Sequence, residues 1–171
     1  MKTVLLLCLG IVGAVAVAAL SPQGKPAQAP KFVEGPHVNG RVTAYAKQPL
    51  TLVHFWTFAC SNCRYNLPIY SEWEAKYKAR GLKVVGVHTP ELSYERDLDN
   101  VLKAVDELKI TYPVLVDGEA ANWKKWGVHY WPSYYLVDAH GVIRESGYGE
   151  IHEDKAGWEA KISGLLTEAG R

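Results

Sequence analysis

An apolar run from Leu50 to Trp56 is followed, three residues later, by Cys60-Ser61-Asn62-Cys63 and then by a helical pattern. Such a run predicts a strand buried on both faces, with the cysteines at the start of the helix that follows it. A helix N-terminus carries unpaired N–H groups, which favour a thiolate over a thiol. Two cysteines at this spacing can close a small disulfide. The junction therefore predicts redox chemistry, with Cys60 as the nucleophile.

Strand and helix patterns alternate along the rest of the chain, in the order β-α-β-α-β-α-β-β-α. Apolar runs predict the strands, and apolar residues at helical spacing predict the helices. Strands followed by helices imply parallel pairing, and the hairpin at Ala139-His140-Gly141 adds antiparallel strands. We therefore predict an α/β fold with a mixed sheet and helices on both faces. The expected strands are 50–56, 82–88, 111–116, 133–137 and 142–146, and the expected helices are 60–80, 93–108, a short one through Trp123 and Trp126, and 152–169.

The chain has 171 residues, of which 48% are hydrophobic, and this suits one well-filled core. Residues 1–20 carry Lys2 and then an apolar stretch, which predicts a signal peptide or signal anchor. Small residues favour cleavage near residues 16–19, although the stretch is also near the minimum length of a membrane anchor. Residues 21–31 are rich in Pro, Gln, Ala and Gly and predict a flexible linker. The folded domain is expected at 32–171.

The charge balance is almost even, with 19 Lys and Arg residues against 18 Asp and Glu residues. This gives no support for nucleic-acid binding or for a polybasic membrane surface. Export to a periplasmic or other extracytoplasmic compartment would expose the thiols to oxidising conditions. The short loop between Cys60 and Cys63 makes a purely structural disulfide a weak explanation.

The same cysteine spacing also supplies half of many zinc sites. A second pair of ligands is hard to find, because the remaining cysteine, Cys8, lies in the leader and no second C-x-x-C occurs. The six histidines do not show the H-x3–5-H spacing of zinc sites. The sequence therefore favours redox chemistry over a metal site.

Several segments together resemble the thioredoxin superfamily over about residues 40–170. They are Val53-His54-Phe55-Trp56, the cysteine pair, and Trp131-Pro132 directly before a strand. The leader, Asn66-Leu67-Pro68 and Val87-His88-Thr89-Pro90-Glu91 narrow the resemblance to exported TlpA/ResA-like proteins, especially the DipZ-like branch. The fold implied is a thioredoxin-like three-layer sandwich.

The resemblance also implies roles for individual residues. Cys60 would be the exposed nucleophile that holds a mixed disulfide, and Cys63 the resolving thiol. Pro132 would be a cis-proline that presents backbone groups to a substrate peptide, and Trp131 would influence the choice of partner. The expected activity is thiol:disulfide exchange with protein thiols and disulfides, favoured in the reducing direction. It would need no dissociable cofactor beyond the redox-active disulfide, and relatives of this kind depend on a membrane electron donor.

Two further residues are candidates for tuning the thiols. His54 stands where thioredoxins place a buried aspartate, and a neutral histidine there could take the proton of Cys63. Glu91 is expected near the thiol pair, where its charge would raise the thiol pKa and its carboxylate could shuttle a proton. The alternatives are a core histidine and a surface acid that opens the next helix.

Two other functions remain open from the sequence. Thr57-Phe58-Ala59-Cys60 contains the T-x-x-C arrangement of peroxiredoxin-like peroxidases, although Val53 stands where that family has a proline. A soft-metal chaperone could bind Cu(I) through Cys60 and Cys63. The absence of any methionine beyond Met1 weakens that second alternative.

Overall fold

The computed structural model describes residues 27–43 and 45–171. The predicted leader at 1–20, its cleavage site and Cys8 lie outside the described residues, as does most of the predicted linker. Among the described residues, Ala27 and Gln28 already contact the sheet, before the expected domain start at Phe32. Gln28 forms a β-bridge with Val142, and the carbonyl of Ala27 accepts a hydrogen bond from the backbone of Ile143 at 2.9 Å.

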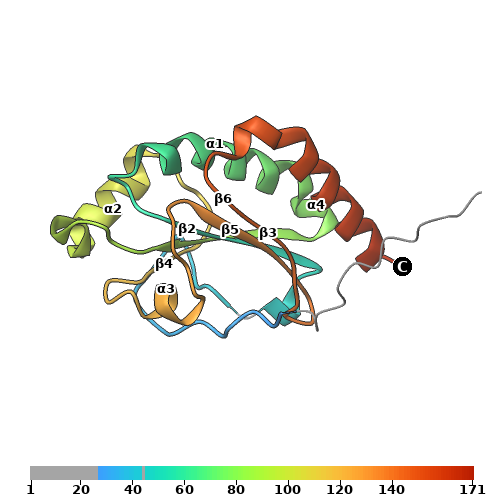
Figure 1. Ribbon diagram of the computed structural model, residues 1–171, viewed down its shortest axis with the longest axis horizontal. Coiled ribbons are helices and arrows are strands. Elements are labelled where there is room, and N and C mark those ends of the chain that lie inside the picture. Colours follow the sequence, from blue (N-terminus) through green and yellow to red (C-terminus); the bar gives the residue numbers. More distant parts are fainter. Residues whose placement is uncertain (1–26, 44) are drawn as a thin grey trace, which may run out of the picture.

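A six-stranded sheet forms the centre of the molecule, in the order β1-β4-β3-β2-β5-β6 (Figure 1). β2 pairs in parallel with β3, and β3 pairs in parallel with β4. β5, β6 and β1 join through antiparallel pairs. The predicted mixed sheet is confirmed. The strands are β1 (His37–Val38), β2 (Leu50–Trp56), β3 (Leu82–His88), β4 (Val114–Val116), β5 (Ser133–Asp138) and β6 (Ile143–Tyr148).

Helices α1 (Ser61–Tyr77), α2 (Leu98–Glu107) and α4 (Lys155–Ala169) contribute to one large core on the upper face of the sheet (Figure 1). The side chains of this core alternate along the strands, as the period of two requires. In β2, Leu50, Leu52 and Trp56 face these helices. Val53 and Phe55 face the opposite side and pack against a second cluster.

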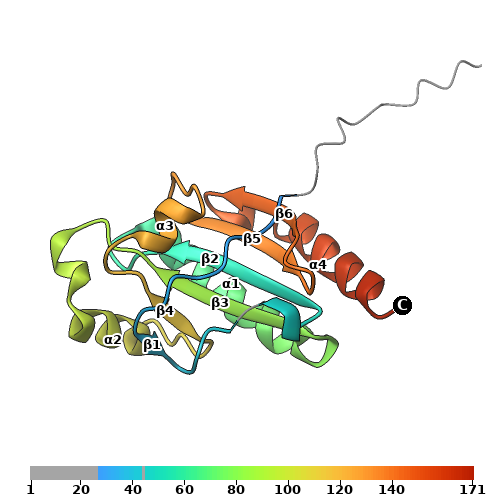
Figure 2. The same cartoon turned by 90° about the horizontal axis from the view of Figure 1, so that it is seen from below.

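The lower face is covered by α3 (Ala121–Lys125), the 3₁₀ turn Tyr45–Lys47 and the segment that precedes β1 (Figure 2). Phe32 from this segment stacks on Trp126 with ring centroids 5.6 Å apart. The side chain of Asn122 accepts from the Val33 amide at 2.7 Å and donates to the Val33 carbonyl at 2.9 Å. The predicted three-layer arrangement is confirmed, with an irregular third layer.

One predicted helix is wrong in its extent. The expected helix over 93–108 is instead a 3₁₀ turn, Ser93–Arg96, followed by α2. Asp97 between them is extended, with φ −69° and ψ 121°, and its side chain caps α2 by accepting from the Asp99 amide. The break turns the side chain of Glu95 into the interior, where it is 0% exposed.

Candidate active site

The two cysteines lie at the carboxyl end of β2, where the chain turns into α1. Cys60 is the N-cap of α1 and has extended backbone geometry, and its Sγ accepts a hydrogen bond from the Cys63 amide at 3.3 Å. Cys60 is partly exposed and Cys63 is buried. Only Cys60 can therefore meet a large substrate from solvent.

The pKa values of the two thiols are driven apart. The pKa of Cys60 falls to about 7, chiefly because the Cys63 side chain donates a hydrogen bond to it, with backbone N–H groups adding to the effect against partial burial. The pKa of Cys63 rises far above its ordinary value because of burial and because its proton is shared with Cys60. The pair therefore has one thiolate that is ready to react at neutral pH and one thiol that holds its proton.

Pro132 lies at the same end of the sheet as the thiols because of the strand register. Ser133 at the start of β5 pairs with Phe55 near the end of β2, so Trp131 and Pro132 fall at the same edge of the sheet as Cys60. The Trp131–Pro132 peptide bond is cis. The Pro132 carbonyl accepts from the Gly149 amide at 2.9 Å.

Trp131 is fixed by a second tryptophan. Its ring stacks on Trp123 of α3 with centroids 3.9 Å apart, and its Nε1 donates to the Thr89 carbonyl at 3.2 Å. The loop that carries Pro132 is therefore supported from both α3 and the end of β3.

Glu91 follows β3 and is exposed. Its negative charge acts on both thiols and raises the pKa of Cys60 and of Cys63, as the smallest of the named influences on each. The structure thus places Glu91 near the pair but on the solvent side.

His54 is fully buried on the face of β2 that packs against α1. Its ring lies 4.4 Å from the ring of Tyr70 and 5.3 Å from that of Tyr112, measured between centroids. Burial lowers its pKa to about 3, so it is neutral at physiological pH. Its aromatic neighbours place it within the core beneath α1.

Two polar residues near the thiols were not singled out from the sequence. Asn66, one turn after Cys63, is buried and holds the segment after β6, since it donates to the Gly149 carbonyl and accepts from the Ile151 amide, each at 2.9 Å. Glu95 accepts a hydrogen bond from the Thr57 hydroxyl. A polar residue within an apolar helical pattern was the available signal in both cases.

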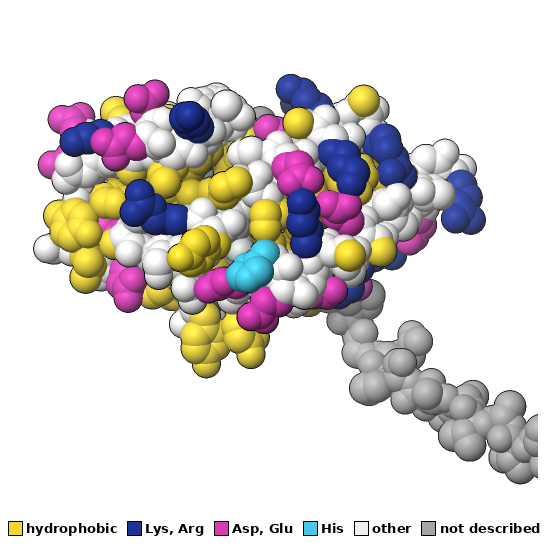
Figure 3. All heavy atoms as spheres, turned by 90° about the horizontal axis from the view of Figure 1, so that it is seen from above, with side chains coloured by type: hydrophobic (Ala, Val, Ile, Leu, Met, Phe, Trp, Pro, Cys, Tyr) yellow, Lys and Arg dark blue, Asp and Glu magenta, His cyan; other side chains and the backbone are white. Residues whose placement is uncertain are grey.

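A groove beside Cys60 is lined by residues from two loops and two helices. Its lining includes Phe58 and Ala59 from the loop after β2, Arg64 from α1, and Leu92 and Tyr94 from the segment after β3. Hydrophobic side chains gather at the α2 end of the upper face, whereas charged side chains are scattered over the α4 end (Figure 3). The groove itself presents apolar side chains together with the charged groups of Arg64 and Glu107.

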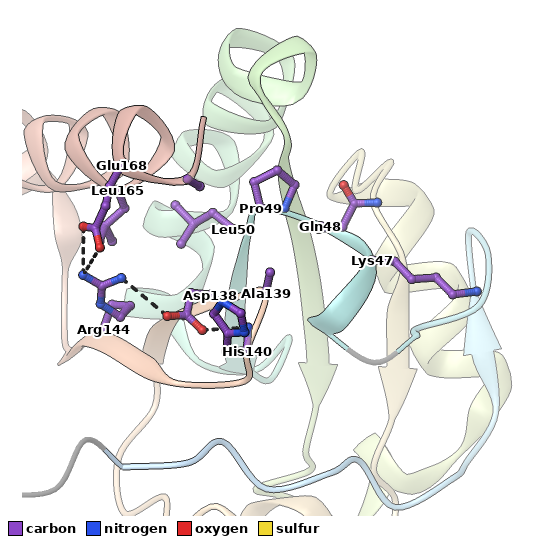
Figure 4. A pocket seen from close by; sticks show the side chains of 11 residues that line it. Lys47, Gln48, Pro49, Leu50, Asp138, Ala139, His140, Arg144, Leu165 and Glu168 are labelled. Carbon is purple, nitrogen blue, oxygen red and sulfur yellow. Dashed lines mark hydrogen bonds and ion pairs between the residues drawn. The ribbon is translucent and has the colours of Figure 1, made fainter. Parts of the chain in front are cut away.

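A second pocket lies at the opposite end of β2 and is built around Arg144 (Figure 4). The guanidinium of Arg144 contacts the carboxylates of Asp138 at 3.4 Å and Glu168 at 2.9 Å. Its charge is thus already balanced, and the pocket is separated from the thiols by the length of the strand.

The described residues contain no group of three or more His, Cys, Asp or Glu side chains placed to hold a metal ion. Within residues 27–43 and 45–171, none of the helices combines the length and apolar character needed to cross a bilayer.

The Redoxin family model matches residues 22–162, which is most of the chain. The chain belongs to the Redoxin family. It is 41% identical over 120 residues to the protein DipZ of Mycobacterium bovis, covering 70% of this chain and 17% of DipZ. It is 34% identical over 110 residues to the thiol-disulfide oxidoreductase YkuV of Bacillus subtilis, covering 63% of this chain and 73% of YkuV.

Solved structures agree with these relatives. A crystal structure described as a thiol:disulfide interchange protein DsbE from Chlorobium tepidum superposes with a TM-score of 0.74 at 26% identity, covering 84% of this chain and 98% of that one. The family, the fold and the thiol pair place this chain among the thiol:disulfide oxidoreductases of the thioredoxin superfamily. The predicted family and fold are confirmed.

Proposed function

We propose that this Redoxin-family protein reduces disulfides of protein substrates outside the cytosol. The observation that carries the proposal is the placement of the two thiols at the start of α1: Cys60 is the partly exposed N-cap, whose Sγ accepts from the Cys63 amide, and Cys63 is buried. This placement lowers the pKa of Cys60 to about 7 and raises that of Cys63. A partly exposed thiolate beside a buried, protonated thiol is the arrangement that two-step disulfide exchange needs.

The reaction proceeds in two sulfur transfers. The Cys60 thiolate attacks one sulfur of the substrate disulfide, forms a mixed disulfide and releases the other substrate sulfur as a thiolate. The Cys63 thiol then loses its proton and attacks the Cys60 sulfur. The second substrate thiol leaves, and Cys60 and Cys63 remain joined by a disulfide. Two electrons have passed to the substrate, and a separate dithiol donor must restore the pair.

The reducing direction is supported by the moderate stabilisation of the thiolate. Strong oxidants of this superfamily hold their reactive thiol at a pKa of about 3.5, whereas thioredoxin, a reductant, has about 7. The pKa of about 7 at Cys60 resembles the second case. The proposed reaction needs no dissociable cofactor. The leader-like sequence at 1–20 supports export, and the donor is proposed to be a membrane dithiol protein.

Further residues take supporting roles in this proposal. Pro132 and Trp131 present the edge against which the substrate backbone lies. Glu91 receives the proton that Cys63 gives up, and this role is supported by the effect of its charge on both thiols. His54 is neutral and keeps the part of the core beneath α1 uncharged. Substitution of His54 by alanine and by aspartate tests that role, which fails if both thiol pKa values and the exchange rate stay unchanged.

The peroxidase alternative would require the Thr57 hydroxyl to serve the Cys60 thiol. That hydroxyl donates to Glu95 instead. Steady turnover of peroxide would nevertheless promote this alternative, and stoichiometric copper retained after purification would promote the chaperone.

A redox titration with alkylation of free thiols tests the proposal. We expect one reversible two-electron couple in the full chain, with a midpoint nearer thioredoxin's value of about −270 mV than the value of about −120 mV of DsbA. Failure to form the Cys60–Cys63 disulfide at any potential would exclude the dithiol mechanism.

The pH dependence of Cys60 alkylation gives a second prediction. In the reduced chain we expect a midpoint at about pH 7. In Cys63→Ala the midpoint should rise towards that of an ordinary thiol, because the Cys63 side chain is the largest influence that lowers the pKa of Cys60. Iodoacetamide rates between pH 5 and 10 measure both values. An unchanged midpoint in Cys63→Ala would contradict this explanation.

A further inference from the structure

Glu95 is a buried carboxylate next to the loop that leads into Cys60, and it accepts four hydrogen bonds. Its Oε1 accepts from the Thr57 hydroxyl and from the Ala59 amide, the latter at 2.9 Å. Its Oε2 accepts from the amides of Glu91 and Leu92, each at 2.9 Å. Each oxygen is thus bonded to a different loop. The four donors from these loops replace the hydrogen bonds from water that a buried carboxylate would otherwise lose.

The first of these loops, residues 57–59, connects β2 to the thiols. Ala59 directly precedes Cys60 in the chain. The Thr57 backbone acts on Cys63, where its hydrogen bond lowers the thiol pKa against the larger effect of burial. Glu95 therefore contacts a segment that touches both thiols, although its own carboxylate does not bond to either sulfur.

The second loop, residues 91–92, carries the Glu91 side chain whose charge acts on both thiols. Both segments also line the groove beside Cys60, the first through Phe58 and Ala59 and the second through Leu92 and Tyr94. A single carboxylate thus joins the loop of the nucleophile to the loop of the nearby acid.

We propose that Glu95 is a positioning residue for disulfide exchange, which fixes the Cys60 loop against the Glu91 loop and so sets both the reactive thiolate and the width of the groove. The inference rests on the proposed function, because the reacting group that it positions is the Cys60 thiolate. It predicts that Glu95 affects the chemistry of Cys60 beyond any effect on folding.

Glutamine cannot replace the carboxylate at this place. Three of the four groups that face Glu95 are backbone amides, which can only donate, and the fourth is the Thr57 hydroxyl, which can also accept. A glutamine side chain has one accepting oxygen and one donating NH₂ group. Whichever way it turns, the NH₂ group faces at least one backbone amide that can only donate: that of Ala59 in one orientation, and those of Glu91 and Leu92 in the other. One loop must therefore be released, although the size of the side chain is unchanged.

Release of residues 57–59 would raise the pKa of Cys60. The contact between Cys60 Sγ and the Cys63 amide depends on the position of Cys60, and hydrogen bonds from Cys63 are the largest influence lowering the Cys60 pKa. The charge of Glu91 is the smallest named influence and acts in the opposite direction. We therefore expect the pKa of Cys60 to be higher in Glu95→Gln than in the wild type.

The experiment compares the pH dependence of Cys60 alkylation in the reduced full chain and in Glu95→Gln. We expect the midpoint to rise by about one unit. Thr57→Val, which removes one donor and keeps the charge, should give a smaller rise. Asp138→Asn is the matched control, because Asp138 is another carboxylate that holds a loop, through the amides of His140 and Val142, and it lies at the end of β2 away from the thiols. This control should lose stability without moving the midpoint.

An unchanged midpoint in folded Glu95→Gln would overturn the inference, as would an equal rise in Asp138→Asn. If Glu95→Gln does not fold, the alkylation midpoint of Thr57→Val takes its place. A rise in that midpoint supports the inference, and an unchanged midpoint overturns it. Failure of the proposed function has a different signature, namely that the wild-type pair forms no reversible disulfide. The alkylation midpoint can be measured whether or not exchange occurs, so the two failures are distinguishable.

Discussion

Cys60→Ser should abolish disulfide exchange, with a fall in the rate on the order of 10³-fold or more. The serine hydroxyl keeps the N-cap position at the start of α1, but it does not ionise near neutral pH and does not attack a disulfide. Exchange with a disulfide-bonded peptide, followed by the appearance of free thiol, measures the loss.

Cys63→Ser should behave differently, because Cys60 can still attack. We expect a mixed disulfide between Cys60 and the substrate to accumulate, visible as a stoichiometric mass increase that disappears on reduction. Ser61→Ala provides the matched control, since Ser61 is an exposed neighbour in the same turn and should exchange at the wild-type rate. A mixed disulfide in Cys60→Ser and none in Cys63→Ser would reverse the assignment of nucleophile and resolving thiol.

Continuous apolar runs allowed the two central strands to be predicted with their observed ends. β2 and β3 occupy 50–56 and 82–88 in both prediction and structure. Their residues are apolar on both faces and each run ends at a turn signal, so local sequence was sufficient. β1 was missed, because its two residues are a strand only through pairing with β4, far along the chain.

The thiol pair could be located from the sequence, whereas the buried carboxylate of Glu95 that holds the preceding loop could not. The spacing of Cys60 and Cys63 after a buried strand is a local signal. Glu95 gives no local signal of comparable strength, since its role depends on the Thr57 hydroxyl and the Ala59 amide, 38 and 36 residues away. The sequence pointed to Glu91, which the structure leaves exposed, and not to Glu95, which it buries in the 3₁₀ turn before Asp97.

A second large effect is expected on stability in acid, from two buried histidines. Burial lowers the pKa of His54 to about 3 and that of His88 to about 4, against the effect of Glu95 and Asp117, which raise the latter. The ring nitrogens of both histidines lack hydrogen-bond partners within the described part of the chain. His88 stacks on Phe58 with centroids 5.4 Å apart. A proton on either ring would therefore place a charge in an apolar setting.

The unfolded chain protonates these histidines as the pH falls through about 6.5, whereas the folded chain keeps them neutral until about pH 3 to 4. The unfolded state thus binds more protons in this window, and the free energy of unfolding falls as the pH falls. Between pH 7 and pH 5 we expect a loss of about 2 kcal/mol from each histidine. The lowered pKa of Glu95 adds a further loss only at lower pH.

Denaturant unfolding at pH 7 and pH 5 measures this loss, and substitution separates the two contributions. His54→Leu removes one titrating group, so the difference between the two pH values should shrink by about 2 kcal/mol. Taking the difference between pH values cancels the fixed cost of repacking the site beside Tyr70. His140→Gln is the matched control, because His140 is exposed and should leave the acid sensitivity as in the wild type. If His54→Leu and the wild type lose the same free energy of unfolding between pH 7 and pH 5, then His54 gains its proton in the folded chain at about the same pH as in the unfolded chain. A charged His54 beneath α1 would then replace the neutral one in the mechanism, and would stabilise a thiolate in that region.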